Sequence, residues 1–496
     1  MADFTVPAFI RGELVTDNLV EFGGRGGDAT FLAPDPMTIL DRLPLKDPGK
    51  MADLYDLSLE EIIDFLAEVG KRLELSSNTL LQAALENSSL VSDMTRPLLE
   101  SAYAGMQWFF QPDLVREVAD FQIGIPYLEG WVESKLSTGL RVAQRAFGAR
   151  ALHIVAGNAP AISTMSIIRN AVTRSDAIIK LPSNDCLTSL VIARTMADVD
   201  ANHPVTKHLS VAYWRGGDTA FEKRLYDPAN IEKILAWGGF ASVKHVTQYI
   251  QPGLELISLD PKRSATVIGR EAFASDEAMA EAAVRVAADI GSLNQLGCVN
   301  ARVIFTACGR DSAGVQRANA FGEHVCKALA ELPQHVSTPA KRFDPELRSE
   351  IDALRLNPDF YKVIGCQKNN GGVIVSQLGE PVEFYPKLGG RVGNIVPIDD
   401  ELDAVAFMNS YTQTIGVYPE SLKVRIRDTL ALHSGQRIVS LGFATSGHPG
   451  MPQDGIEPLR RMVKWIVDEI SDPAAVPAPW IDHSSAGNAA AARAAA

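Results

Sequence analysis

The sequence lacks the features that mark a secreted or membrane protein. Its first residues, Met-Ala-Asp-Phe-Thr-Val-Pro, have neither the basic start nor the apolar core of a signal peptide. No apolar run approaches the ~20 residues that a membrane-spanning helix needs. We therefore expect a cytoplasmic protein with no membrane span.

Cysteine and positive charge are also scarce. Five cysteines, an odd number without paired spacing, argue against a disulfide framework or a zinc site, and the histidines show no ligand spacing, so we predict no metal centre. Lys and Arg number 47 against 60 Asp and Glu, a net charge of −13. A negative surface repels polyanions, and we expect no nucleic-acid partner. Backbone N–H groups at a helix N-terminus could still bind a phosphorylated cofactor.

What is present is a chain of 496 residues, long enough for two or three domains of roughly 100–200 residues each. Apolar residues recur at spacings of three and four over residues 58–120, which predicts amphipathic helices with Trp108, Phe109 and Phe110 in the core. After Arg150 the pattern becomes strand, polar or glycine-rich turn, helix, repeated several times. This alternation predicts an α/β fold with a doubly wound parallel sheet, which binds ligands at the carboxyl ends of its strands.

Three of these turns carry candidate binding residues, and each has a purely structural alternative. Asn158 follows a predicted strand and either caps the next helix or donates its amide to an oxyanion. Lys180 ends a strand and either reaches solvent or meets a ligand phosphate. Gly238 and Gly239 either form an ordinary turn or let backbone approach a pyrophosphate. The G-x-G-x-x-G motif is absent, so a standard dinucleotide fold is not indicated.

Cys298 is the candidate nucleophile. It lies in a loop between a predicted helix at 276–290 and a predicted strand at 301–306, without packing periodicity. Cys308 and Cys326 occupy apolar positions and are expected to be small core residues. The context of Cys298 is therefore the one suited to covalent catalysis.

Five stretches, taken in order, resemble the aldehyde dehydrogenase superfamily and more closely its long-chain acyl-CoA reductase branch, the LuxC-type fatty-acid reductases of bioluminescence operons. They span residues 150–470 and read Ile154-Val-Ala-Gly-Asn-Ala-Pro, Ile179-Lys-Leu-Pro-Ser, Ala236-Trp-Gly-Gly, Asn294-Gln-Leu-Gly-Cys-Val-Asn and Pro452-Gln-Asp-Gly-Ile-Glu-Pro-Leu-Arg-Arg-Met-Val-Lys-Trp. Each is weakly specific alone, whereas the ordered set is specific.

The resemblance implies a domain order. Residues 1–262 would form an N-terminal and nicotinamide-cofactor-binding domain, to which 434–470 return, and residues 263–433 a catalytic domain. An oligomerisation arm is placed near 131–147 and 470–482, which implies a homo-oligomer. The Ala-rich residues 484–496 are expected to be a disordered tail or a cloning remnant.

The resemblance also assigns roles. Cys298 is implied as the nucleophile, and Asn158 as the oxyanion donor together with the Cys298 backbone N–H. Lys180 and Ser183 would meet the cofactor ribose and 2′-phosphate, and Gly238 and Gly239 the pyrophosphate. Because Ser183 is neutral where an acidic ribose ligand would repel a 2′-phosphate, NADPH is favoured over NADH.

Two departures from the superfamily bear on the reaction. The Glu-Leu-Gly-Gly motif, whose glutamate activates water, is replaced by a stretch with Ser258 at the glutamate position. The Glu-x-Phe-Gly-Pro motif is replaced by residues 387–391. Without a carboxylate base near Cys298, hydrolysis of a thioester intermediate is slow, which favours a reductase over an oxidising dehydrogenase.

The expected function is NADPH-dependent reduction of a long-chain acyl thioester, acyl-CoA or acyl-protein, to the aldehyde through an acyl-cysteine. One alternative is an NAD(P)-dependent aldehyde dehydrogenase, which needs a general base. Another is an acyl-accepting subunit active only in a complex with an acyl-protein synthetase. The resemblance makes a synthetase and a thioesterase plausible partners.

Overall fold

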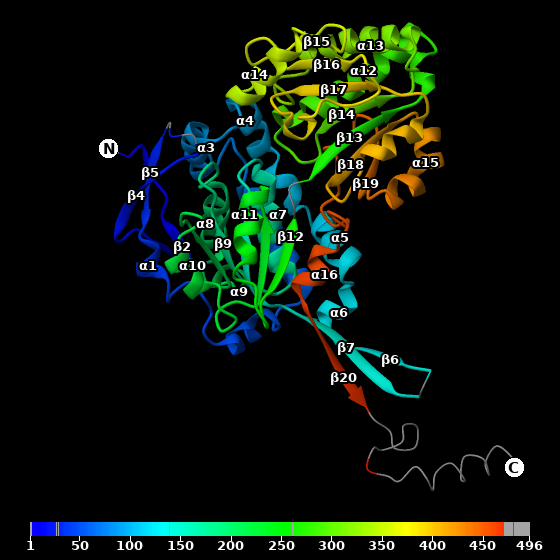
Figure 1. Cartoon of the computed structure of the whole chain (residues 1–496). Helices are drawn as coiled ribbons and strands as arrows, with labels where there is room; N and C mark the ends of the chain where they lie inside the picture. Colours follow the sequence, from blue (N-terminus) through cyan, green and yellow to red (C-terminus); the bar gives the residue numbers. More distant parts are fainter. Residues whose placement is uncertain are drawn as a thin grey trace, which may run out of the picture.

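The computed structural model describes residues 2–25, 27, 29–137, 139–259, 262–470 and 480. Within these residues, two seven-stranded sheets form two units with helices packed on their faces (Figure 1). A small sheet of β1 (Phe4–Thr5), β5 (Thr30–Pro34) and β4 (Leu19–Gly23) packs beside the first unit. The predicted α/β architecture with parallel sheets is confirmed.

The first sheet has its topological switch point at β8. Its order is β12 (Glu255–Leu259), β11 (Lys233–Trp237), β8 (Arg150–Ile154), β9 (Asp176–Lys180), β10 (Leu209–Ala212), β2 (Ala8–Ile10) and β3 (Glu13–Val15). The strands from β8 to β12 are parallel, whereas the N-terminal hairpin of β2 and β3 adds antiparallel strands beside β10. The chain moves outward from β8 in both directions, and ligands bind such sheets at this point.

Helices cover both faces of the first sheet. One face packs against α7 (Pro160–Val172), α8 (Thr188–Asp200) and the N-terminal helices, and the other against α1 (Pro36–Ile39), α10 (Thr219–Leu225) and α11 (Phe240–Thr247). The N-terminal helices are α2 (Leu59–Arg72), α3 (Thr79–Val91), α4 (Arg96–Ala104), α5 (Pro112–Gln122) and α6 (Ile125–Glu129). A capping box of Ser58 and Glu61 starts α2. Phe110 is buried as predicted, but Trp108 is 45% exposed, so its placement in the core was wrong.

The second sheet holds the candidate nucleophile at its amino edge. Its order is β15 (Tyr361–Gly365), β16 (Gly372–Ser376), β17 (Val392–Pro397), β14 (Ala301–Thr306), β13 (Arg263–Ile268), β18 (Thr412–Tyr418) and β19 (Arg437–Ser440), all parallel except β15. The helices α12 (Asp276–Gly291) and α13 (Ser312–Glu331) pack on one face, and η6 (Glu401–Phe407) and α15 (Glu420–Leu432) on the other. Because β19 pairs with β18, the chain leaves this sheet after Ser440, later than the predicted boundary at 433.

A three-stranded antiparallel sheet projects away from both units (Figure 1). It consists of β6 (Val132–Lys135), β7 (Arg141–Phe147) and β20 (Lys464–Ile470). β6 and β7 lie within residues 131–147, the first segment of the predicted arm. The second was placed at 470–482, yet the pairing with β7 already begins at Lys464 and continues over the whole of β20. Most of 470–482 and the predicted tail at 484–496 lie outside the described residues.

The loop between α12 and β14 has an unusual backbone. Leu293, Asn294 and Gln295 are successive non-glycine residues with φ of 54°, 53° and 63°, in the left-handed region. Such a conformation costs on the order of 1–3 kcal/mol per residue and persists only where the surroundings impose it. This loop carries the chain from the end of α12 to Cys298.

Buried amide side chains hold the loop. Gln295 Nε2 donates to the carbonyls of Ala301 and Val392 at 2.9 and 2.8 Å, and its Oε1 accepts from Val392 N–H at 2.9 Å. Asn294 exchanges two hydrogen bonds with Thr338. Asn300 Nδ2 donates to the carbonyls of Asp289 in α12 and of Ser292 just after it, and its Oδ1 accepts from Gly297 N–H. The position of Cys298 is therefore set by polar contacts inside the protein.

Gln295→Leu should destabilise the protein, because Gln295 is 3% exposed and its loss removes hydrogen bonds from two carbonyls and an N–H. A buried polar group that loses its partner costs about 1–3 kcal/mol. In urea unfolding, the Gln295→Leu variant should have a lower free energy of unfolding than the Gln316→Leu control. Gln316 is an exposed residue of α13. Equal stability of the two variants would contradict the role given to Gln295.

Candidate functional site

Cys298 lies where β13, β14 and β18 begin. Its Sγ accepts a hydrogen bond from Gln413 Nε2 at 3.2 Å, and its carbonyl accepts one from Ser264 Oγ at 2.7 Å. The Ser264 hydroxyl in turn accepts from Thr414 N–H at 3.2 Å. Gln413 and Thr414 belong to β18 and Ser264 to β13, so the second sheet fixes both the backbone and the sulfur of this cysteine.

Asn158 joins the first unit to the cysteine loop. It follows β8, and its Nδ2 donates to the Leu296 carbonyl at 2.9 Å, two residues before Cys298. An amide nitrogen carries two hydrogens, so one remains for a ligand atom. Asn158 Oδ1 is buried and accepts no hydrogen bond from any residue that the structure describes. The structure thus brings two predicted catalytic residues to one junction between the units.

Asp454 is a further member of this cluster that the sequence had not suggested. The Nε2 of Gln413, which donates to Cys298 Sγ, also donates to the Asp454 carboxylate. Burial raises the pKa of the Cys298 thiol, and the negative charge of Asp454 raises it further. The hydrogen bond from Gln413 and the positive charge of Arg302 lower it. The resting sulfur is therefore a thiol with a thiolate-stabilising donor already in contact.

The loss of the glutamate at Ser258 predicted that no carboxylate base stands near Cys298, yet another carboxylate lies two hydrogen bonds from the sulfur. Ser258, which the resemblance places at the glutamate position, pairs with Ala236 within the first sheet. Asp454 supplies a carboxylate from a different part of the chain, the loop between β19 and α16 (Pro458–Met462). The carboxylate contacts the Gln413 amide, which contacts the sulfur. Two sequence signals existed: Gln413 is a polar residue in the buried strand β18, and Asp454 lies within a stretch that carried the resemblance.

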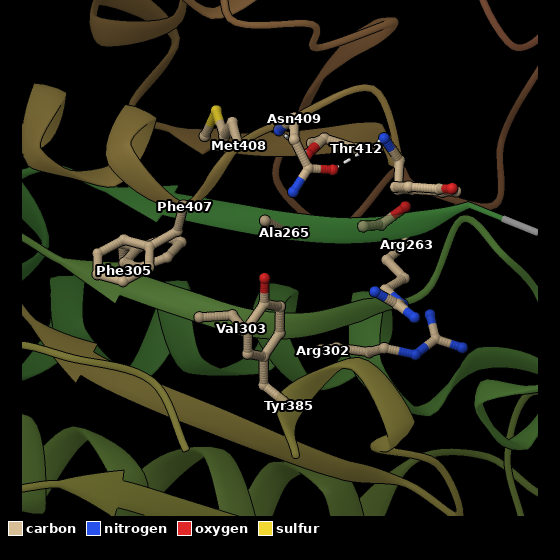
Figure 2. A pocket seen from close by; sticks show the side chains of 12 residues that line it. Arg263, Ala265, Arg302, Val303, Phe305, Tyr385, Phe407, Met408, Asn409 and Thr412 are labelled. Carbon is tan, nitrogen blue, oxygen red and sulfur yellow. Dashed lines mark hydrogen bonds between the residues drawn. The ribbon is translucent and has the colours of Figure 1, made fainter. Parts of the chain in front are cut away.

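Two arginines share a pocket beside the cysteine. Arg263 and Arg302 line it with Ser264 and with apolar side chains of Val303, Phe305, Tyr385, Phe407 and Met408. Figure 2 shows both guanidinium groups at the same end of this pocket. Neither arginine forms an ion pair with a carboxylate in the described part of the chain. Burial lowers the pKa of Arg302 to about 10, and the charge of Arg263 acts in the same direction.

The predicted cofactor residues lie at the carboxyl edge of the first sheet. Lys180 ends β9, and Gly238 and Gly239 follow β11, so they flank β8 on its two sides. Lys180 Nζ lies 5.5 Å from the ring centre of Trp214, and burial lowers the pKa of this lysine to about 8, against the opposing charge of Glu222.

Space for a ligand exists beside these residues. Gly239 is the N-cap of α11, and a Cβ added there would meet no atom within 4 Å. Ser183 is half-buried in the turn that follows Lys180. The structure therefore gathers the four predicted cofactor residues at one sheet edge.

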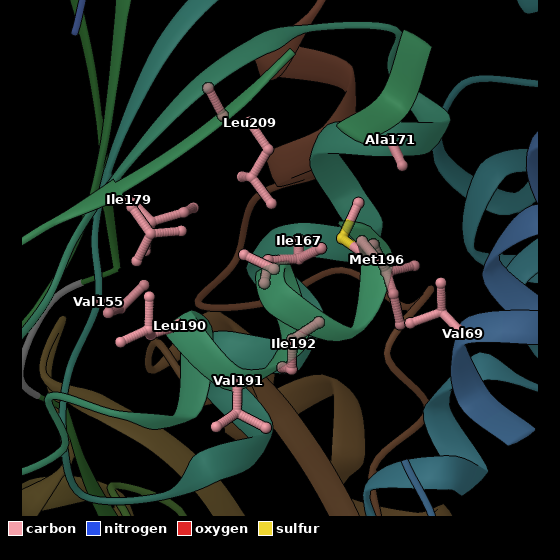
Figure 3. Close-up of a cluster of buried hydrophobic side chains, with 14 of the residues drawn as sticks. Val69, Val155, Ile167, Ala171, Ile179, Leu190, Val191, Ile192, Met196 and Leu209 are labelled. Carbon is pink, nitrogen blue, oxygen red and sulfur yellow. The ribbon is translucent and has the colours of Figure 1, made fainter. Parts of the chain in front are cut away.

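Packing under β8 and β9 fixes these strand ends. Val155, Ile179, Leu190 and Ile167 are buried together between the sheet and the helices α7 and α8 (Figure 3). Above them the turns come very close, since a Cβ at Gly157 would lie 2.2 Å from Asn184 Oδ1. Only glycine fits at that point.

An apolar pocket lies next to the Asp454 loop. Its lining comes from η2 (Met106–Phe110), α5, α7 and the loop after β19, namely Phe109, Val118, Met165, Ile168, Arg169 and Pro449. Arg169 Nη2 donates to Gln453 Oε1 at 3.1 Å, beside Asp454. The pocket is thus connected through one arginine to the loop that contacts Gln413.

The other cysteines do not share these surroundings. Cys186, Cys308 and Cys366 are buried and Cys326 is half-buried, and burial raises the pKa of each thiol. Over the described ranges, no cluster of His, Cys, Asp and Glu is suited to hold a metal ion. No helix among the same residues is long and apolar enough to cross a membrane.

Comparison with solved structures shows the fold. The chain resembles an NADP-dependent glyceraldehyde-3-phosphate dehydrogenase from Bacillus halodurans, solved with NADP, with a TM-score of 0.72 and 13% identity over 95% of this chain and 100% of that one. It also resembles aldehyde dehydrogenase 21 from Physcomitrella patens, with a TM-score of 0.73 and 11% identity over 95% and 99% of the chains. The aldehyde-dehydrogenase-like fold is confirmed.

Comparison of sequences identifies the family. A long-chain acyl-protein thioester reductase of Vibrio harveyi is 26% identical over 84% of both chains. The protein of the same name from Photorhabdus laumondii is 28% identical over 92% of this chain and 90% of its own. Residues 54–465 match the family described as "Acyl-CoA reductase (LuxC)". With its fold and with a family match over most of its length, the chain belongs to the LuxC family of acyl-CoA reductases.

Proposed function

We propose that the protein reduces a long-chain acyl thioester to the aldehyde through an acyl group on Cys298, with NADPH as the reductant. The observation that carries this proposal is the junction at Cys298, where amide donors from both units meet and the nearby carboxylate binds an amide. The family description names acyl-CoA, and the named relatives act on acyl-protein thioesters. Acyl-CoA and acyl-protein are both thioester donors of an acyl group.

Each residue at the junction has a defined task in this proposal. Cys298 Sγ attacks the acyl carbon as the thiolate, and the free hydrogen of Asn158 Nδ2 and the Cys298 backbone N–H bind the oxyanion. The donor's carbon–sulfur bond breaks and its thiol leaves. A nicotinamide held by Lys180, Ser183, Gly238 and Gly239 would supply the hydride that the acyl carbon accepts. The bond to Cys298 then breaks, its electron pair returns to Sγ, and the aldehyde departs.

Hydrolysis is the competing fate of the acyl group. An aldehyde dehydrogenase needs a base that activates water against the thioester. Ser258 lacks a carboxylate, and the carboxylate of Asp454 accepts a hydrogen bond from Gln413. This arrangement favours storage of the acyl group until a hydride arrives, and so supports a reductase.

The carboxyl edge of the first sheet suits a dinucleotide. The ammonium group of Lys180 and the hydroxyl of Ser183 provide a cation and a neutral donor, as a 2′-phosphate requires. Gly239 leaves open space at the start of α11 for a pyrophosphate, whereas a Cβ at Gly238 would lie 3.2 Å from the Ser242 side chain. The neutral Ser183 is the reason for proposing NADPH over NADH.

Cys298→Ala should reduce acyl-CoA-dependent oxidation of NADPH to background, a loss of roughly 10³-fold or more, because covalent catalysis is removed. Cys326→Ala, which changes a half-buried cysteine on α13, should retain most of the activity. Absorbance at the NADPH band measures both. Activity of Cys298→Ala equal to that of wild type would refute the assignment. Turnover that appears only after addition of an acyl-protein synthetase would support the acyl-accepting subunit instead.

The affinity for NADPH should fall as the pH rises through about 8. Lys180 has a pKa of about 8, and a phosphate binds its protonated form, which is lost above that pH. Fluorescence titration at pH 7 and pH 9.5 should give a dissociation constant that rises about tenfold in wild type. Lys180→Met should bind weakly at both pH values without this dependence. An identical pH dependence in both proteins would show that Lys180 does not meet the phosphate.

A further inference from the structure

One nitrogen atom links the sulfur of Cys298 to a carboxylate. Gln413 is 4% exposed on β18, and its Nε2 donates to Cys298 Sγ at 3.2 Å and to the Asp454 carboxylate. The two partners are far from Gln413 in sequence, 115 and 41 residues away. Two contacts on the two hydrogens of one amide nitrogen leave no donor for any other group.

The carboxylate determines which way the amide faces. A carboxylate only accepts hydrogen bonds, so Asp454 requires the nitrogen of the Gln413 amide on its side. If the amide were turned over, Oε1 would face the carboxylate oxygens and repel them. Since the same nitrogen carries the hydrogen that points at the sulfur, Asp454 also ensures that Cys298 meets a donor and not an oxygen. A hydrogen bond to a charged acceptor is roughly twice as strong as one between neutral groups, so the Asp454 carboxylate can hold the Gln413 amide in this orientation.

We propose that Gln413 is a catalytic hydrogen-bond donor to the Cys298 thiolate, and that Asp454 is the positioning residue that fixes its amide. The inference depends on Cys298 being the nucleophile of the proposed reaction. In this inference the Asp454 carboxylate does not activate water. It orients the side-chain amide of Gln413 by accepting its hydrogen bond.

The donor acts at the two moments when sulfur carries negative charge. The thiolate must exist before it attacks the thioester. It forms again when the bond between the reduced carbon and Sγ breaks and the electron pair returns to sulfur. A fixed N–H at 3.2 Å stabilises the charged sulfur more than the neutral acyl-sulfur. Gln413 therefore favours both the formation of the attacking thiolate and the release of the aldehyde.

Other charged groups act on the same sulfur. Asp454 comes from the loop before α16, Arg302 from β14 and Arg437 from β19. The charge of Asp454 raises the pKa of the Cys298 thiol, and that of Arg302 lowers it. A variant at Gln413 leaves all three charges in place. It therefore isolates the contribution of the hydrogen bond.

The first test needs no substrate. The rate of alkylation of Cys298 by iodoacetamide is measured against pH by peptide mass spectrometry in wild type, Gln413→Met and the exposed control Gln316→Leu. Loss of the donor should move the profile of Gln413→Met to higher pH and slow alkylation at pH 7 about tenfold, with Gln316→Leu unchanged. An unchanged or lower profile would overturn the inference. If Gln413→Met does not fold, Gln413→Asn, whose amide is one methylene short of the sulfur, should show the same shift.

The second test separates positioning from an independent effect. Turnover of acyl-CoA is measured for Gln413→Met, Asp454→Leu and the double variant, with Glu457→Gln as an exposed acidic control in the same loop. Each single change should lower kcat about 10- to 100-fold, and the double variant should lie within about twofold of Gln413→Met. If the double variant instead loses the product of the two single-variant factors, Asp454 acts independently of Gln413, and its positioning role is overturned. Because alkylation is independent of turnover, failure of the proposed reduction would be recognised separately.

Discussion

The left-handed turn at residues 293–295 is the constraint on which the catalytic geometry depends. Its backbone conformation is unfavourable for non-glycine residues. The buried side-chain amides of Asn294, Gln295 and Asn300 compensate with hydrogen bonds inside the protein. The turn ends α12 and delivers Cys298 to the amino edge of the second sheet. There it meets Asn158, which ends β8 of the first sheet. Two independently packed sheets are thus joined at the point where the chemistry is proposed.

The distribution of charge around the sulfur explains why this fold suits reduction. In the superfamily that the chain resembles, a glutamate activates water against the thioester, and the resemblance predicts Ser258 in its place. The carboxylate that remains nearby, Asp454, binds the Gln413 amide, and that amide binds the sulfur. A group that could have promoted hydrolysis is engaged as an acceptor. In the proposed mechanism, the acyl group is then exposed to hydride transfer more than to water.

Much of the fold followed from local pattern, whereas part of the site did not. Alternating strands, turns and helices predicted the parallel sheets, and the strand at 301–306 agrees with β14 residue for residue. Loops with a distinctive sequence, around Asn158 and Cys298, were also identified. Gln413 and Asp454 were missed because their meeting depends on where β18 and the loop after β19 are brought by tertiary packing. The predicted domain boundary at 433 was too early for the same reason. The edge strand β19 is recognised only by its pairing with β18.

The most direct test of the account is the lifetime of the acyl group on the enzyme. Protein incubated with tetradecanoyl-CoA without a nicotinamide should gain the mass of one acyl group, located on the peptide that contains Cys298. The adduct should persist, and addition of NADPH should discharge it as tetradecanal. Rapid loss of the adduct as free fatty acid before NADPH is added, or an equal adduct on Cys298→Ala, would contradict the account.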